Sequence, residues 1–302
     1  YKRQRLLGLP IIAAGKSSEY DYVFHPDTGD VTWLERRVAA PGIAGLWALG
    51  EDRAATVAAR AAALAALPQR TVPDFCEMAL VANATGILPD RADFHAPLAH
   101  TVELPDLYAP RSAGGLLERD GALDVFNVLR RPDEASFAGG VFVVVELADQ
   151  RTGALFAGKG IPVSQDRRRA LIYNPSHLLG VEAPISVLGA ARIDHSILDE
   201  SYVLRTELAA RARVAMPAGT VLAIEGNRHA VPQLEALLLP AAAPGPEAPL
   251  PYYMAVGQRL VRPVAAGALL TMADIAPRTD SVLWALRAEQ DLSLIHISEP
   301  TR

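Results

Sequence analysis

The sequence has very little cysteine and no long apolar run. Cys76 is the one cysteine among 302 residues, so no disulfide can form within the chain. Low cysteine usage suits a reducing compartment, and we expect a cytoplasmic protein. No uninterrupted apolar segment reaches the roughly 20 residues that a membrane-spanning helix needs. Composition therefore favours a globular protein without membrane spans.

Clusters of positive charge are also missing. The chain has 29 Lys and Arg against 34 Asp and Glu, which gives a formal net charge of −5. A nucleic acid or an anionic membrane surface is normally bound by a run of basic residues. Neither is therefore expected as a partner. We expect a small-molecule ligand and a homo-oligomeric assembly instead.

Several catalytic motifs are absent from the sequence. No HExxH, CxxC, GxSxG or P-loop occurs, and the histidines show no metal-ligand spacing. Each of these motifs places specific ligands or nucleophiles at a fixed spacing. A zinc hydrolase or a nucleoside triphosphatase is therefore not supported.

Both ends of the sequence resemble translated adapter DNA. The residues "YKRQ" at 1–4 and "LSLI" at 292–295 can be encoded by reverse-complementary codons. A chance match is the alternative. We expect residues 1–4 and 292–302 to be adapter residues and exclude them from fold reasoning. The natural sequence is then expected to be a fragment.

The first natural residues predict the end of a nucleotide-binding domain. Residues 9–14 form a wholly apolar run, which is typical of a strand buried on both faces of a parallel sheet. A helix end is expected just before it, at residues 5–7, with Gly8 as its stop. Helix, glycine, buried strand and polar loop is the order of a βαβ unit in a doubly wound domain.

Further elements follow from local pattern. Helices are expected at residues 53–67, 73–83 and 176–192, the last one kinked or interrupted at Pro184. Strands are expected at 140–147 and 154–157, with a turn at 149–153 between them. Residues 84–140 hold few periodic runs. The sequence therefore predicts an α/β fold in this part of the chain.

A second, smaller unit is expected after a boundary near residues 205–214. The stretches 216–222 and 263–275 share Pro, a small residue, Gly and an apolar run, which predicts two strands. A Pro/Ala linker at 240–251 separates them and is expected to be extended and exposed. This unit is expected to be small and β-rich.

The stretch "GKSSEYD" at 15–21 is the strongest candidate site. It directly follows a buried strand, where open α/β sheets bind their ligands. Lys16 could polarise a carbonyl or exchange a proton, and Glu19 and Asp21 could hold it, bind hydroxyls or ligate a hard cation. Ser17 and Ser18 are candidate substrate ligands. The alternative is a solvated loop in which a serine caps a short helix.

Four other residues are candidates with open alternatives. Asn83 could contact substrate or cap a helix end, and Lys159, between two glycines, could reach a ligand or be an exposed turn lysine. Arg130 could grip a phosphate or carboxylate, or form a surface ion pair. His177 is expected in the first turn of a helix, where the dipole disfavours the imidazolium. It could donate a hydrogen bond to substrate or act as a cap.

Long stretches of the chain resemble a known family. They are "LGLPIIAAGKSSEYDY", "DFCEMALVANATG", "DVFNVLRRPDEASFAGGVFVVV" and "IYNPSHLLGVEA". They resemble the catalytic half of DXR-like (DRL-type) oxidoreductases, relatives of homoserine dehydrogenase with an N-terminal Rossmann domain. The C-terminal "LPYYMAVGQRLVRPVAAGALLTMADI" resembles a SAF domain. The resemblance implies the end of a Rossmann domain at 5–15, an α+β catalytic domain at 16–205 and a β-rich SAF-like domain at 210–291.

The resemblance implies an NAD(P)-dependent oxidoreductase acting on a sugar-like or sugar-phosphate substrate. The family's best-known activity is the reductive isomerisation of 1-deoxyxylulose 5-phosphate in isoprenoid biosynthesis, with a divalent metal such as Mg or Mn. Lys16 would be catalytic, and Gly15, Gly180 and Glu182 would lie near NADP or NAD. The G-x-G-x-x-G fingerprint of the cofactor domain is absent. A SAF-bearing sugar-acid dehydratase or lyase, or a non-catalytic sugar-binding module, is the alternative.

Overall fold

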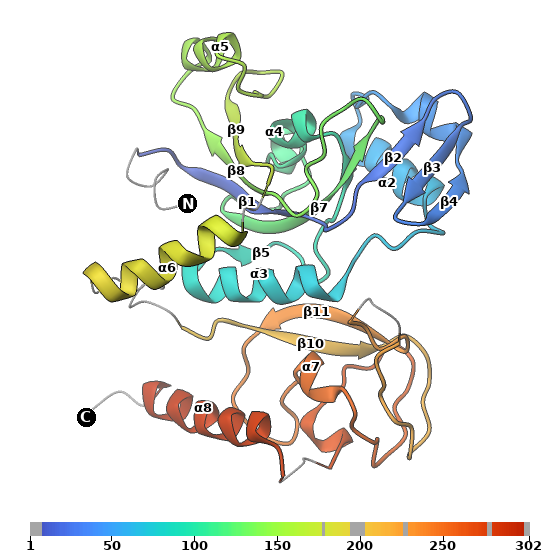
Figure 1. Cartoon of the computed structure of the whole chain (residues 1–302), viewed down its shortest axis with the longest axis vertical. Helices are drawn as coiled ribbons and strands as arrows, with labels where there is room; N and C mark the ends of the chain where they lie inside the picture. The colour runs from blue at the N-terminus through green and yellow to red at the C-terminus, as the bar shows by residue number, and fades with distance from the viewer. Residues whose placement is uncertain (1–7, 177–178, 194–202, 226–228, 277–279, 299–302) are drawn as a thin grey trace. The chain divides into compact units, whose positions relative to one another are not determined.

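The computed structural model describes residues 8–176, 179–193, 203–225, 229–276 and 280–298. The chain divides into two compact units (Figure 1). The first unit is Tyr1–Arg70 with Ile87–Glu200, and the second is Thr71–Gly86 with Ser201–Arg302. The second unit therefore takes one helix from within the N-terminal part of the sequence. Each unit is described by itself below.

The first unit is built on one mixed sheet. Its strands run in the order β4-β3-β2-β7-β1-β8-β9, and β5 and β6 also pair with β7. The α/β fold class is confirmed. The strands are β1 (Ile11–Ser17), β2 (Tyr22–His25), β3 (Asp30–Trp33), β4 (Arg36–Ala39), β5 (Leu88–Pro89), β6 (Leu98–Ala99), β7 (Ala122–Arg130), β8 (Val141–Glu146) and β9 (Arg169–Asn174).

The helices of the first unit are short and lie around this sheet (Figure 1). The α-helices α2, α5 and α6 are the longest, and α4 is a single turn packed near β9. The α-helices of this unit are α2 (Arg53–Ala63), α4 (Leu104–Leu107), α5 (Gln150–Gly158) and α6 (Leu179–Ile193). Its 3-10 helices are η1 (Pro41–Leu46), η2 (Thr101–Glu103) and η3 (Arg111–Ala113).

Strand β1 confirms the predicted buried strand and extends it. It pairs in parallel with β7 and antiparallel with β8, so the sheet around it is mixed and not purely parallel as expected. The strand continues through Lys16 and Ser17, which the sequence analysis placed in a loop. Both side chains are buried, because β7 and β8 pair with the strand through this point.

The longest strand, β7, was not predicted. It pairs in parallel with β1, β2, β5 and β6 at successive positions along its length. All but its last residue are buried, including Asp124 and Asn127. These two polar residues interrupt the apolar pattern that would have indicated a buried strand.

In the first unit two helix predictions were confirmed and one strand prediction was wrong. Helices α2 and α6 fall within or close to their predicted ranges, and α6 carries Pro184 inside it. The predicted turn at 149–153 and strand at 154–157 are instead helix α5. The Asp149 side chain accepts a hydrogen bond from the Thr152 N–H at 2.8 Å and so starts a helix where a turn was expected.

The second unit combines helices with a two-stranded sheet. Its elements are α3 (Val72–Thr85), β10 (Thr206–Ala212), β11 (Leu234–Pro240), α7 (Tyr252–Ala255), η5 (Met272–Asp274) and α8 (Val282–Ser298). Helix α3 confirms the third predicted helix. The stretches 216–222 and 263–275, predicted as strands, make only isolated bridges, one of which joins Met216 to Val264. Proline and glycine in each stretch prevent continuous pairing.

Candidate active site

Two loops meet where β1 and β7 end. The Ser17 N–H donates to the Gly140 carbonyl at 2.9 Å, and the Gly139 N–H donates to the Ser18 carbonyl at 3.1 Å. The Ser17 hydroxyl donates to the Phe137 carbonyl. These bonds join the β1–β2 loop to the β7–β8 loop, which is distant in sequence. The Ser17 hydroxyl is therefore engaged by the protein itself.

Lys16 is a buried cation at the end of β1. Its side chain is 1% exposed, and its Nζ lies 2.6 Å from Oε1 of Glu19. The Glu19 side chain is 44% exposed, so this carboxylate links a buried ammonium to solvent. A buried charge needs such a partner, because transfer of an unpaired ion from water is very costly. The geometry provides a proton donor with a route to water.

Asp21 binds Arg130 and not Lys16. Its Oδ2 accepts from the Arg130 Nε at 2.6 Å, and the two side chains are 6% and 20% exposed. The Arg130 Nη1 also donates to the carbonyls of Arg131 and Glu134. The other Asp21 oxygen, Oδ1, is buried and has no hydrogen-bond partner among the described groups. The pair thus ties the β1–β2 loop to the end of β7.

Asn83 is engaged within the second unit. Its Oδ1 accepts from the backbone N–H groups of Arg205 and Thr206 at 2.8 and 2.9 Å, and its Nδ2 donates to the Thr206 carbonyl at 3.2 Å. Helix α3 ends at Thr85, and the next residue, Gly86, caps it in the left-handed conformation. These contacts join α3 to the start of β10, and a substrate contact by Asn83 stays a prediction.

Lys159 lies far from Lys16 along the sheet. It is exposed and follows α5, which itself follows the end of β8. Because β8 is antiparallel to β1, its end lies beside the start of β1. The structure therefore does not bring Lys159 to Lys16. Gly180 is exposed and Glu182 half-buried in the first turn of α6, and His177 lies outside the described residues.

Gly15 is required by strand packing. A Cβ added there would fall 1.8 Å from the Asp124 carbonyl oxygen, since β1 and β7 approach closely at this point. This contact explains a glycine without a cofactor, and its predicted approach to NADP or NAD stays a prediction.

Three residues with buried polar side chains were not among the predicted site residues: Asp124, Asp90 and His95. The Asp124 carboxylate is fully buried and accepts the backbone N–H groups of His95 and Ala96 at 3.0 and 3.1 Å. Burial raises the pKa of this carboxyl. The His95 Nε2 lies 2.9 Å from Asp90 Oδ2. Asp90 follows β5, which pairs with the first two residues of β7, Ala122 and Leu123.

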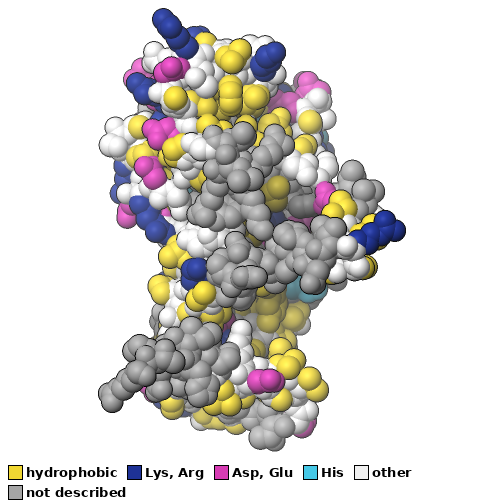
Figure 2. Space-filling view, turned by 90° about the vertical axis from the view of Figure 1, so that its left-hand side faces the viewer, with side chains coloured by type: hydrophobic (Ala, Val, Ile, Leu, Met, Phe, Trp, Pro, Cys, Tyr) yellow, Lys and Arg dark blue, Asp and Glu magenta, His cyan; other side chains and the backbone are white. Residues whose placement is uncertain are grey.

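Two further features of the described residues concern helix length and surface charge. No described helix has both the length and the apolar character needed to cross a bilayer. Figure 2 shows basic and acidic side chains interspersed over the upper part of one face. Among the described residues no group of three or more His, Cys, Asp or Glu side chains could hold a metal ion, so the Mg or Mn site stays a prediction.

The comparison with protein families decides the classification. The family model for the oxidoreductase DRL catalytic domain matches residues 1–183. The chain belongs to this family. A comparison with curated proteins gives no significant match. The matched part of this DRL catalytic domain includes Lys16, Glu19, Asp21 and Arg130, and an oxidoreductase family of this kind points in general to a nicotinamide cofactor.

Proposed function

We propose that this DRL-family chain supplies the catalytic lysine of an NAD(P)H-dependent oxidoreductase that reduces or oxidoisomerises a sugar-like or sugar-phosphate substrate. The observation that carries the proposal is the ion pair of buried Lys16 with half-exposed Glu19 at the end of a central strand. Open α/β sheets bind ligands at such strand ends. A DXR-like or homoserine dehydrogenase-like reaction needs an acid at this place.

Lys16 would act at the substrate carbonyl. Its ammonium donates a hydrogen bond to the carbonyl oxygen and stabilises the negative charge that grows there. A nicotinamide cofactor would supply the hydride when bound, and Lys16 would transfer its proton to the oxygen, which gives the alcohol. Glu19 then delivers a proton from solvent to Lys16 through their 2.6 Å contact.

The neighbouring residues would position this pair. Asp21 and Arg130 hold the β1–β2 loop against β7, and Ser17 holds the β7–β8 loop. Ser18 stays a candidate substrate ligand. In this proposal Asp21 and Arg130 position Glu19 and the substrate, and Lys16 is the residue that donates the proton.

The described residues do not fit the pyrophosphate of a dinucleotide. The sequence has no G-x-G-x-x-G, so no such loop leads from a strand into a helix N-terminus. NADP or NAD as the donor, a divalent metal, a homo-oligomer and a cytoplasmic location remain parts of the proposal.

Turnover of Lys16 variants tests the proposal. Oxidation of NADPH or NADH would be followed with 1-deoxyxylulose 5-phosphate and other sugar phosphates as substrates, and reduction of NADP+ or NAD+ with homoserine. We expect Lys16→Met to lower kcat by roughly 10²–10⁴-fold, the usual contribution of a positioned acid. Glu19→Gln should lower it less, because water can still reprotonate the lysine. Arg151→Met, which removes an exposed charge on α5, is the matched control. Near-normal turnover of folded Lys16→Met would refute the assignment.

A further inference from the structure

Lys16 shares a row across the sheet with one residue from each of the next two strands. Lys16 of β1 pairs with Val141 of β8, and Val141 pairs in turn with Asn174 of β9. Both strand pairs are antiparallel, and residues directly opposite each other in such a pair project from the same face of the sheet. Figure 1 shows the three strands side by side. The side chains of Lys16, Val141 and Asn174 therefore lie in line on one face.

The adjacent row projects from the opposite face of the sheet. In that row Gly15 pairs with Phe142, and Phe142 pairs with Tyr173. The Phe142 ring is buried and packs edge-to-face on Phe126 within the apolar core of the first unit. Because side chains alternate between the two faces along a strand, Lys16 projects away from this core.

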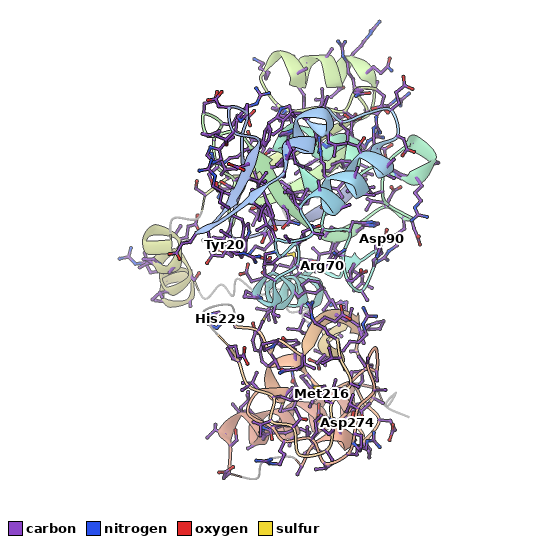
Figure 3. All side chains as sticks on the ribbon, turned by 90° about the vertical axis from the view of Figure 1, so that its right-hand side faces the viewer. Tyr20, Arg70, Asp90, Met216, His229 and Asp274 are labelled. Atoms are coloured by element: carbon purple, nitrogen blue, oxygen red, sulfur yellow. The ribbon has the colours of Figure 1, made fainter. Side chains whose placement is uncertain are left out.

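Exposure rises along the row from Lys16 to Asn174. The Lys16 side chain is 1% exposed, Val141 is 39% exposed although β8 is paired on both edges, and Asn174 is exposed. The β1–β2 loop, which Tyr20 marks in Figure 3, carries Glu19 as the ion-pair partner of Lys16. Val141 thus presents an apolar surface to solvent between two polar side chains, which is the usual composition of a ligand site.

The protein uses the Asn174 amide only in part. Its Oδ1 accepts from the Ser176 N–H at 3.5 Å, which is longer than the usual range of about 2.7–3.2 Å. Among the described residues no group accepts a hydrogen bond from its Nδ2. An amide offers both donors and an acceptor and carries no charge, so it suits a hydroxyl, whereas a phosphate is usually bound by a cation.

The spacing of the row fits one small molecule. Neighbouring strands lie about 4.8 Å apart, so the backbones of Lys16 and Asn174 are roughly 10 Å apart across β8. We propose that Asn174 binds a hydroxyl of the substrate whose carbonyl is bound by Lys16, with the carbon chain of the substrate lying over Val141. The proposal rests on the proposed function and adds a substrate-binding residue to its site. The substrate enters from the exposed end of the row, at Asn174, and its reacting carbon reaches the buried end, at Lys16.

Ligand binding to the whole chain tests this inference without turnover. Isothermal titration calorimetry would give the Kd of 1-deoxyxylulose 5-phosphate and of its 3-deoxy and 4-deoxy analogues. Asn174→Leu removes the amide at similar size and should weaken binding of the parent compound about threefold to tenfold, the contribution of one hydrogen bond. One of the two analogues lacks the hydroxyl that Asn174 binds, and it should bind Asn174→Leu and the wild type equally.

A second variant separates substrate binding from a role in the turn. Asn174→Asp keeps an acceptor for the Ser176 N–H but loses the amide donor, so we expect it to weaken binding as well. Ser176→Ala changes an exposed side chain of the same turn and is the matched control, with binding like that of the wild type.

Three results would overturn the inference alone. They are wild-type binding by both Asn174 variants, a loss confined to Asn174→Leu, which would assign the residue to the turn, and an equal loss for the parent compound and both analogues. In each case reduced turnover of Lys16→Met would still support the proposed function. Absence of 1-deoxyxylulose 5-phosphate binding by the wild-type chain would instead overturn the inference together with the sugar-phosphate substrate on which it rests.

Discussion

Arg60 allows a quantitative test of how the first unit is held together. Its side chain is fully buried in α2, and its guanidinium has five N–H donors. Two of them bind the oxygens of Glu103 at 2.7 and 2.9 Å. The others bind the carbonyls of Leu46 at 2.9 Å, Trp47 at 2.7 Å and Leu98 at 3.1 Å. One side chain therefore joins α2 to η1, β6 and η2.

The expected effect of Arg60→Met follows from these contacts. Removing one partner of a buried ion pair costs about 3–5 kcal/mol, because the other charge stays buried. The carbonyls that lose a donor add about 1 kcal/mol each where water cannot reach them. Partial relaxation and the continuing bond from the His100 N–H to Glu103 reduce the total. We expect a loss of about 4–6 kcal/mol, a large part of a typical domain stability of roughly 5–15 kcal/mol.

The assay is urea unfolding followed by tryptophan fluorescence. Trp33 and Trp47 both lie in the first unit, so they report on the part of the protein that Arg60 stabilises. Arg60→Lys keeps the charge but not the planar fork of donors, and we expect it to cost about half as much as Arg60→Met. Arg91→Met is the matched control, since Arg91 pairs with Asp93 at the surface with 47% of its side chain exposed. Exposed pairs contribute about 0–1 kcal/mol.

A double-mutant cycle separates the ion pair from the carbonyl contacts. Arg60→Met with Glu103→Leu removes both charges, and we expect a coupling energy of about 1–3 kcal/mol between them. The reasoning is refuted if Arg60→Met costs no more than Arg91→Met. A coupling energy near zero would instead assign the whole cost to the backbone carbonyls.

Two further predictions concern packing and alkaline pH. Gly15→Ala should lower stability by about 3 kcal/mol or more, because its Cβ would lie 1.8 Å from the Asp124 carbonyl oxygen, while Gly158→Ala, with open space around it, should not. Equal melting temperatures for the two variants would contradict this. Burial, with the nearby Cys76 thiol, raises the pKa of Tyr253 to about 12. The folded state then holds this proton more tightly than the unfolded chain, so stability should fall as pH rises from about 10 to about 12. Tyr253→Phe should lose that part of the pH dependence, and an identical pH profile would disprove the assignment.

The elements predicted from sequence are those with a strong local pattern. The apolar run of β1 and the alanine-rich α2 indicate their structure without reference to distant residues. Helix α5 was mistaken for a strand because its apolar run is short, and a short run fits either element. Asp149 caps the start of that helix with its side chain, and an Asp at this position was the sequence signal that could have indicated a helix.

Strand β7 could not be predicted because its polar residues are bonded by distant segments. The Asn127 Nδ2 donates to the Gln69 and Ala96 carbonyls, and Asp124 accepts from the backbone N–H groups of His95 and Ala96. A polar residue is tolerated in a buried strand when such partners exist. The partners are fixed only by the tertiary fold, so the apolar pattern alone excludes the strand that lies at the centre of the sheet.

The same distinction applies to the candidate site. Glu19 lies three residues after Lys16, and a contact over this separation could be anticipated from the sequence. Asp21 and Arg130 are 109 residues apart, and only the pairing of β2 with β7 brings them together. The sequence therefore indicated the partner of Lys16 but not that Asp21 pairs with Arg130.

Gly139 shows how the fold permits the Lys16–Glu19 pair. Its φ is +73°, which residues with a side chain rarely adopt, and a Cβ there would lie 3.4 Å from the Glu19 Oε2. An alanine would combine backbone strain with an apolar group against a half-exposed carboxylate. The loop after β7 thus needs glycine both to make its turn and to leave the Glu19 carboxylate open to water. In the proposed mechanism Lys16 is reprotonated after each reaction, and that step would depend on this opening.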